Sequence, residues 1–154
     1  SFGARVSGFE RVAERRRFPL ALEYARPATA ARTVLIGNAA QSLHPIGAQG
    51  FNLGLRDALT LVECIEAAHA RGEHPGGEAM LTEYAQRRRE DRERTIAFSD
   101  GLARLTSNPS ALVSPLRTLG LFALDHDAAL RARVVAGAMG YRGDIPLLCR
   151  EAHA

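Results

Sequence analysis

The stretch "LIGNAAQSLHPIGAQGFNLGLRDALTLVE", residues 35–63, decides the fold of this chain. It begins apolar, turns through glycines and a proline, and then shows a helical pattern. The run "RTVLIG", 32–37, is short, β-branched and apolar, which predicts a strand buried on both faces. Residues 38–50 are expected to form a loop, and a helix is predicted over 51–71, with Gly72 as its stop.

The predicted helix has apolar residues at helical spacing, which place them on one stripe of its surface. This stripe consists of Leu55, Ala58, Leu59, Val62 and Ile65.

A strand, a glycine-containing turn and a helix together form a common cradle for anionic or polar ligands. Backbone N–H groups at the start of a helix lack intrahelical partners, and the helix dipole makes that end positive. Gly37 permits a tight turn, and Asn38 follows at the strand tip, where open α/β sheets bind ligands. The pattern alone leaves a simple glycine-rich connector equally open. The candidate binding residues are Gly37, Asn38, Ala39, Ala40, Pro45, Gly47, Gln49, Gly50, Phe51 and Asn52.

The rest of the chain predicts one further strand and three further helices. "FPLALEY", 18–24, alternates as a strand does, with Pro19 at its start or on an edge. Helices are predicted over 78–105, 116–124 and 128–139, the last ending at Gly140, and the tail is predicted as loop. We interpret the mixed-charge run in the 78–105 helix as a solvated face rather than a nucleic-acid site. Two strands are too few for a stable sheet beside this much helix. Either a small α+β domain pairs with a partner, or the fold is α/β, read as α+β in a fragment, and the other strands of its sheet are missing from this chain.

Composition excludes several classes of protein. The 154 residues carry a net charge of +3, which is too weak to indicate nucleic-acid binding. No signal peptide or membrane-spanning run is visible, and no metal set or catalytic triad can be assembled from the spacing. We expect Cys64 and Cys149 to be buried free thiols in a reducing compartment, with a disulfide as the alternative.

Residues 32–63 resemble the second FAD-binding motif of the flavin-dependent aromatic hydroxylases, the para-hydroxybenzoate hydroxylase class. That family shows G-D-A-A-H, then a proline, then G-x-G-x-N-x-G-x-x-D. The variant here has N-A-A-Q, L-H-P and Q-G-F-N-L-G-x-R-D. It is similar to the ubiquinone-biosynthesis branch, most of all to 2-polyprenyl-6-methoxyphenol hydroxylase. The resemblance covers about residues 8–105 well and the C-terminal third weakly.

This resemblance implies the C-terminal part of a two-domain FAD/NAD(P)-binding, Rossmann-like fold. Residues 1–72 would hold the end of the substrate sheet, the last strand of the FAD domain, and the flavin loop with its helix. Residues 73–154 would form the C-terminal helical region of that domain. The family's G-x-G-x-x-G motif is absent from these residues. We therefore expect the missing N-terminal part of the same protein as a partner, and weak FAD binding by this chain alone.

The resemblance also assigns roles around the flavin. Asn38 stands where the family has an acidic residue that bonds the ribityl chain, and an amide can still bond a hydroxyl. The amides of Gly50, Phe51 and Asn52 match those that meet the pyrimidine end of the flavin ring. Reduced flavin is negative there, which suits the start of a helix.

Other residues of the motif also have expected roles. Pro45 matches the family's proline near the reactive edge of the flavin, with His44 beside it. His44 could touch flavin or substrate, or it could bond only backbone; both interpretations stay open. We favour a bracing role for Arg56 and Asp57 over direct chemistry.

The activity implied by the resemblance is an FAD-dependent monooxygenase that hydroxylates a polyprenylated phenol in ubiquinone biosynthesis. NAD(P)H would reduce FAD, and O₂ would act through a flavin C4a-hydroperoxide. The alternatives are another aromatic substrate, or a non-catalytic helical binding module with a degenerate flavin motif.

The same resemblance implies a cytoplasmic protein, with a ubiquinone-biosynthesis complex and peripheral contact with the inner membrane as open alternatives. The segment "ALVSPLRTLGLFAL", 111–124, could line a path for a polyprenyl tail or lie on a membrane surface. An ordinary core helix is the interpretation that we favour for it.

Overall fold

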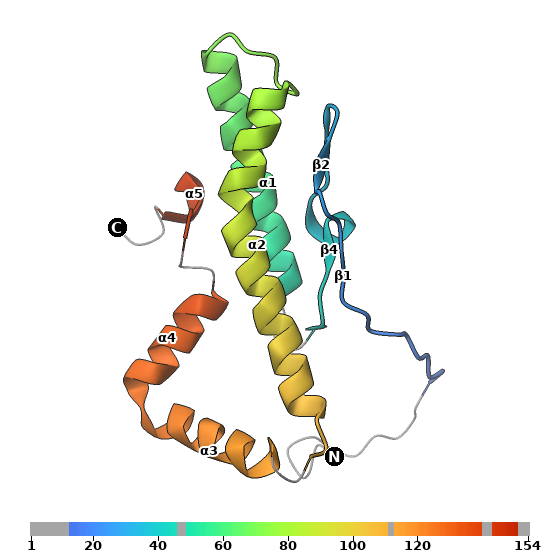
Figure 1. Ribbon diagram of the computed structural model, residues 1–154, viewed down its shortest axis with the longest axis vertical. Coiled ribbons are helices and arrows are strands. Elements are labelled where there is room, and N and C mark those ends of the chain that lie inside the picture. The colour runs from blue at the N-terminus through green and yellow to red at the C-terminus, as the bar shows by residue number, and fades with distance from the viewer. Residues whose placement is uncertain (1–12, 46–48, 111–112, 140–142, 151–154) are drawn as a thin grey trace.

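Two long helices dominate the computed structural model, which describes residues 13–45, 49–110, 113–139 and 143–150. Helices α1 (Gln49–Ala70) and α2 (Glu78–Ser107) form an antiparallel hairpin along the long axis (Figure 1). Gly72 has a φ of +70°, its amide donates to the His69 carbonyl, and the Glu73 amide donates to Ala68. These bonds form a left-handed cap that only glycine adopts easily, so the predicted helix stop is confirmed.

The interface between α1 and α2 is more polar than the sequence suggests. On α1 the apolar stripe is only partly buried, because Leu55, Val62 and Ile65 are 49%, 48% and 37% exposed. The buried residues of α1 are mostly small or polar instead, with Leu53 as the large apolar exception. The buried residues of α1 are Gln49, Leu53, Arg56, Asp57, Thr60, Cys64 and Ala68, and those of α2 are Met80, Tyr84, Arg88, Asp91, Thr95 and Ser99.

Ion pairs cross this interface out of contact with solvent. Arg56 donates from Nε and Nη2 to the two oxygens of Asp91, at 2.8 and 3.2 Å. Arg88 donates from Nη2 to Asp91 at 2.7 Å and from Nε to Asp57 at 2.8 Å. The prediction of a wholly solvated charged face on α2 is therefore wrong at Arg88 and Asp91. It is confirmed for Arg104, which is exposed and pairs with the half-buried Asp100 one helical turn away.

A small apolar core completes the hairpin near its loop. Cys64, Ala68, Met80 and Tyr84 are buried together there. Both cysteines are free thiols, as expected, although Cys149 is only half-buried. Burial raises the pKa of the Cys64 thiol, with Arg87 opposing the shift. Cys64 therefore behaves as a small core residue.

The strands are shorter and differently paired than predicted. Strand β1 (Glu23–Tyr24) pairs antiparallel with β4 (Gln41–Ser42), and β2 (Thr29–Ala30) pairs antiparallel with β3 (Thr33–Val34). The predicted strands 18–24 and 32–37 shrink to β1 and β3, and the predicted loop contains β4 and the 3₁₀ turn η2 (Gly37–Ala39). A strand lengthens only where neighbours pair with it, and each described strand has one partner. The buried two-sided strand is therefore not formed within the described residues.

The C-terminal helices form an arm beside the hairpin (Figure 1). Helix α3 (Val113–His126) is longer than the predicted helix over 116–124, and α4 (Ala128–Ala138) is close to the one predicted over 128–139. Helix α5 (Leu147–Arg150) replaces part of the predicted loop. The Leu147 amide, at the start of α5, donates to Glu63 on α1 at 2.5 Å. Gly140, the predicted end of the fourth helix, lies outside the described residues.

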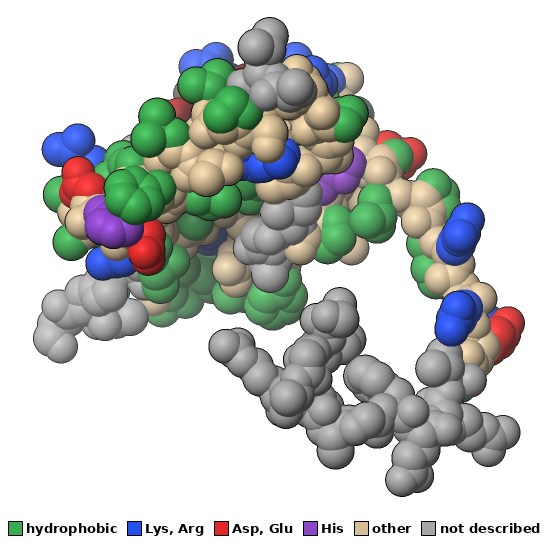
Figure 2. Space-filling view, turned by 90° about the horizontal axis from the view of Figure 1, so that it is seen from below, with side chains coloured by type: hydrophobic (Ala, Val, Ile, Leu, Met, Phe, Trp, Pro, Cys, Tyr) green, Lys and Arg blue, Asp and Glu red, His purple; other side chains and the backbone are tan. Residues whose placement is uncertain are grey.

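Helix α3 buries no residue in the described part of the chain, so the expected core helix is not seen there. Leu116, Leu119, Leu121 and Phe122 are each more than half exposed. Figure 2, seen from the α3 end, shows hydrophobic side chains spread over this surface. Among the described residues, no helix has both the length and the apolar character that crossing a membrane requires.

The buried ion pairs predict a sharp contrast between two aspartates of α2. Asp91→Ala leaves Arg56 and Arg88 buried without their shared acceptor, and should lower the free energy of unfolding by about 3–5 kcal/mol. Asp100→Ala leaves Arg104 in contact with solvent, since that side chain is 80% exposed, and should cost less than about 1 kcal/mol. Urea denaturation of both variants measures the difference, and equal losses would contradict the ion-pair interface.

Candidate functional site

The η2 turn lies directly on the first turns of α1. Ile36 is extended, and the chain reverses at Gly37, whose φ of +57° is strained for any residue with a side chain. Asn38 and Ala39 are exposed, whereas Ala40 is packed inside. The turn therefore presents one amide side chain and little bulk to solvent.

A glycine on α1 lets the turn approach the helix. A Cβ atom added to Gly54 would lie 3.0 Å from the Gly37 Cα and 3.7 Å from its nitrogen. The two backbones therefore touch. Gly54 was not among the predicted binding residues. The available signal was its spacing, because Gly54 follows Gly50 by one helical turn and shares its face.

Asp57, on α1, binds the η2 turn through hydrogen bonds. Its Oδ2 accepts from the Gly37 amide at 3.3 Å and from Gln41 Nε2 at 2.8 Å, while Oδ1 accepts from Arg88. The side chain is fully buried. The predicted bracing role of Asp57 is confirmed, and its neighbour Arg56 braces the helix hairpin through Asp91.

Gln41 links the turn to α2, a role that sequence reasoning missed. Its amide nitrogen donates to Asp57, and its Oε1 accepts from Arg92 Nε at 2.8 Å. Arg92 Nη2 also reaches the carbonyls of Ala25 and Ala40, at 3.5 and 3.4 Å. The amide suits this place because its nitrogen donates while its oxygen accepts, and the N-A-A-Q variant was the sequence signal.

The turn and the helix enclose an open hollow of about 500 Å³. It brings together four of the predicted residues, namely Gly37, Asn38, Gly50 and Phe51. Its lining is mostly apolar or backbone, with Asn38 as the only side-chain amide. The other lining residues are Ile36, Gly54, Leu55 and Ala58.

The chemistry of this hollow suits a flat, electron-rich group. The first-turn amides of α1 have no intrahelical acceptors, and no acidic residue lies in that turn. The Asn38 side chain can donate to or accept from a hydroxyl. Phe51 is 80% exposed beside them and offers an aromatic surface. These features fit a flavin, whose pyrimidine end gains negative charge on reduction.

Other predicted residues lie elsewhere. The Gln49 side chain is buried and donates to the Ala138 carbonyl at 3.3 Å, facing α4 rather than the hollow. The His44 carbonyl accepts from Ser99 at 3.3 Å, and neither His44 nor Pro45 lines the hollow. Three further candidates, Ala39, Ala40 and Asn52, adjoin the hollow in sequence without lining it, and Gly47 lies outside the described residues.

The sequence of the chain was compared with protein families and with known proteins. Residues 6–99 match the family model described as "FAD binding domain". The chain belongs to this family. Its matched region includes the η2 turn, the whole of α1 and most of α2. The residues of the buried ion pairs, Arg56, Asp57, Arg88 and Asp91, lie within the matched range.

Three of the relatives found are named as enzymes of ubiquinone metabolism. Ubiquinone hydroxylase UbiL of Rhodospirillum rubrum is 37% identical over 139 residues, which are 90% of this chain and 32% of that protein. Human mitochondrial ubiquinone biosynthesis monooxygenase COQ6 is 34% identical, covering 86% of this chain and 28% of that protein. The 3-demethoxyubiquinol 3-hydroxylase of Escherichia coli is 32% identical, covering 80% and 32%. The resemblance seen in the motif is thereby confirmed.

The chain spans about a third of the length of these relatives. No solved structure matches it.

The contact between Gly37 and Gly54 predicts opposite outcomes for two glycine-to-alanine changes. Gly101→Ala, on α2 with nothing within 4 Å, should stabilise the protein by about 0.5–1 kcal/mol through helix propensity. Gly54→Ala should lose about 1 kcal/mol or more, because its methyl group pushes the turn off α1. Urea denaturation measures both changes. An equal gain for both variants would show that the turn does not rest on Gly54.

Proposed function

We propose that this chain forms part of an FAD-dependent monooxygenase that hydroxylates a polyprenylated phenol in ubiquinone biosynthesis, with NAD(P)H as reductant. The observation that carries the proposal is the hollow between the η2 turn and the start of α1. It combines an exposed side-chain amide, the first-turn amides of α1, which lack intrahelical acceptors, and glycine walls. The printed names of the relatives support the reaction class and the pathway.

The residues of the hollow would bind and orient the cofactor. Asn38 would bond a hydroxyl of the ribityl chain, and the amides of Gly50 and Phe51 would face the pyrimidine end of the ring. Bound FAD supplies the activation of O₂ and the transfer of one oxygen atom to the phenol. The protein's part is to fix the ring and to keep water from it, which needs a turn that does not move.

The rest of the binding site would come from outside these residues. The glycine motif that holds the ADP half of FAD in this class is absent from residues 1–154. The exposed stripe of α1, with Leu55, Val62 and Ile65, offers an apolar surface on which the remaining part of the protein would pack. The same arrangement would explain the short strands, because β1 and β3 would gain neighbours there.

Asn38 tests the proposal in the whole protein that the gene encodes. Flavin fluorescence titration should show FAD binding, and Asn38→Ala should raise the dissociation constant about five- to tenfold by removing one hydrogen bond. With FAD, NAD(P)H and O₂, the whole protein should add one oxygen to a short-chain polyprenyl phenol, as mass spectrometry can detect.

Gln86→Ala is the matched control, because this amide is exposed on α2 and far in sequence from the turn. It should leave FAD binding and product formation unchanged. The proposal fails if the whole protein binds no FAD, or if it hydroxylates simple aromatic acids and no polyprenyl phenol. An unchanged affinity in the Asn38 variant would remove that residue from the site.

A further inference from the structure

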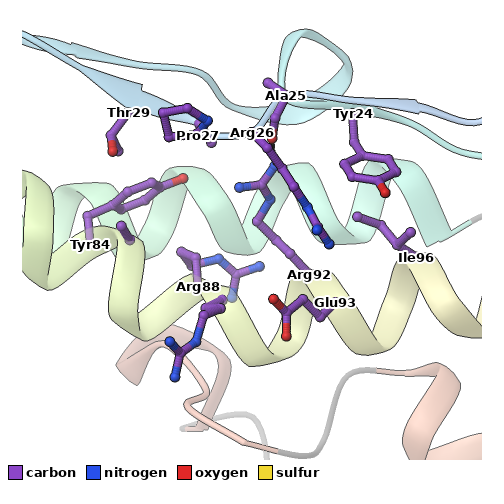
Figure 3. Close-up of a pocket in the computed structure, with 13 residues that line it drawn as sticks. Tyr24, Ala25, Arg26, Pro27, Thr29, Tyr84, Arg88, Arg92, Glu93 and Ile96 are labelled. Carbon is purple, nitrogen blue, oxygen red and sulfur yellow. Dashed lines mark hydrogen bonds between the residues drawn. The ribbon is translucent and has the colours of Figure 1, made fainter.

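A second hollow lies between the segment that joins β1 to β2 and one face of α2 (Figure 3). It has a volume of about 300 Å³. In Figure 3, Tyr84, Arg88 and Arg92 rise from α2 toward the segment, and Arg26 extends from the segment toward the helix. Arg89 also lines this hollow. None of these residues lines the hollow at the η2 turn.

Positive charge exceeds negative charge on the walls. Arg88 is balanced by Asp57 and Asp91, whose carboxylates outweigh burial and raise its pKa. Among the described residues, Arg26, Arg89 and Arg92 form no ion pair with a carboxylate. The acceptors of Arg92 are all neutral: Gln41 Oε1 and the carbonyls of Ala25 and Ala40. Glu93 is the one carboxylate among the lining residues, so three guanidinium groups face a single opposing charge.

Arg26 is held in place by a neutral group. Its guanidinium carbon lies 5.0 Å from the centroid of the Tyr24 ring, which leaves its N–H edge available. Planar guanidinium groups with free edges match the oxygens of phosphate and carboxylate groups.

A buried donor without an acceptor lies at the same place. Arg88 is 1% exposed, and its Nη1 has no hydrogen-bond partner among the described residues. An unpaired buried donor of this kind is costly, so a native structure usually supplies an acceptor. Tyr84 beside it stays a neutral phenol, because burial and the Asp57 carboxylate raise its pKa.

We propose that this hollow binds the oxyanion of a small molecule, a phosphate or carboxylate group, through Arg26, Arg89 and Arg92. Its volume is at the low end for ligand pockets, which suits one such group rather than a whole dinucleotide. The walls come from two segments that Arg92 already ties together, so the site is formed before a ligand arrives. The proposal does not depend on the flavin function proposed above.

The test uses inorganic phosphate and the whole protein that the gene encodes. Isothermal titration calorimetry at constant ionic strength should show saturable binding. The double variant Arg26→Gln, Arg89→Gln should weaken it about tenfold or more, since two charge-assisted contacts are lost. Both side chains are exposed, so the melting temperature should not change. The control Arg15→Gln, Arg104→Gln alters the net charge equally at exposed sites, and should leave the affinity within about twofold.

Competition distinguishes the two chemical sources. Acetate binding more tightly than phosphate would assign the site to a carboxylate ligand. Displacement of phosphate by NADP⁺ but not by NAD⁺ would assign it to a nucleotide phosphate. The proposal is overturned if neither anion binds saturably, as when a carboxylate of the same protein fills the hollow, or if both double variants bind phosphate equally.

Discussion

The buried carboxylate of Asp57 is the group on which the arrangement of the site depends. It accepts from the backbone of the turn, from the amide of Gln41 and from the guanidinium of Arg88. Each donor belongs to a different segment, so one side chain fixes η2, β4 and α2 relative to α1. A carboxylate with no access to solvent tolerates little movement of its partners, because a lost hydrogen bond would not be replaced by water. The turn is thus rigid before any ligand binds.

This design explains why two neighbouring helices bury ions at their contact. Buried ion pairs are weak sources of net stability, since desolvation offsets most of their attraction. Their value here is geometric. The pairs Arg56–Asp91 and Arg88–Asp57 set the register of α1 against α2, and Arg92 extends the same register to the strand segment. The apolar stripe of α1 stays largely exposed to solvent. A flavin loop at the start of α1 and an arginine-lined hollow beside α2 are therefore positioned by one network.

Sequence patterns predicted the parts of this structure that depend on local chemistry. Helix α1 and its stop at Gly72 follow from periodicity and from a left-handed cap, which are local signals. The clustering of Gly37, Asn38, Gly50 and Phe51 follows from the motif, because its spacing returns the turn to the helix start. The bracing role of Asp57 was also expected from its place on the first turns of the helix.

Long-range pairing was beyond that reach. An apolar stripe shows that a segment is helical but not what packs against it, so the exposure of Leu55 and Val62 could not be predicted. The charge run of α2 looks solvated until a partner carboxylate on α1 is known, as for Arg88. Gln41 gave no periodic signal, since its role is to bond two residues that lie far along the chain.

The most direct measurement is the dissociation constant of FAD for the whole protein carrying Asp57→Asn. The asparagine keeps the size of the side chain and removes the charge that binds Gln41 and Arg88 together. We predict that FAD binds about tenfold more weakly or worse, with the helical circular dichroism retained, because the turn loses its fixed position. Wild-type affinity in a folded Asp57→Asn protein would contradict the account, since the flavin loop would then not depend on this carboxylate.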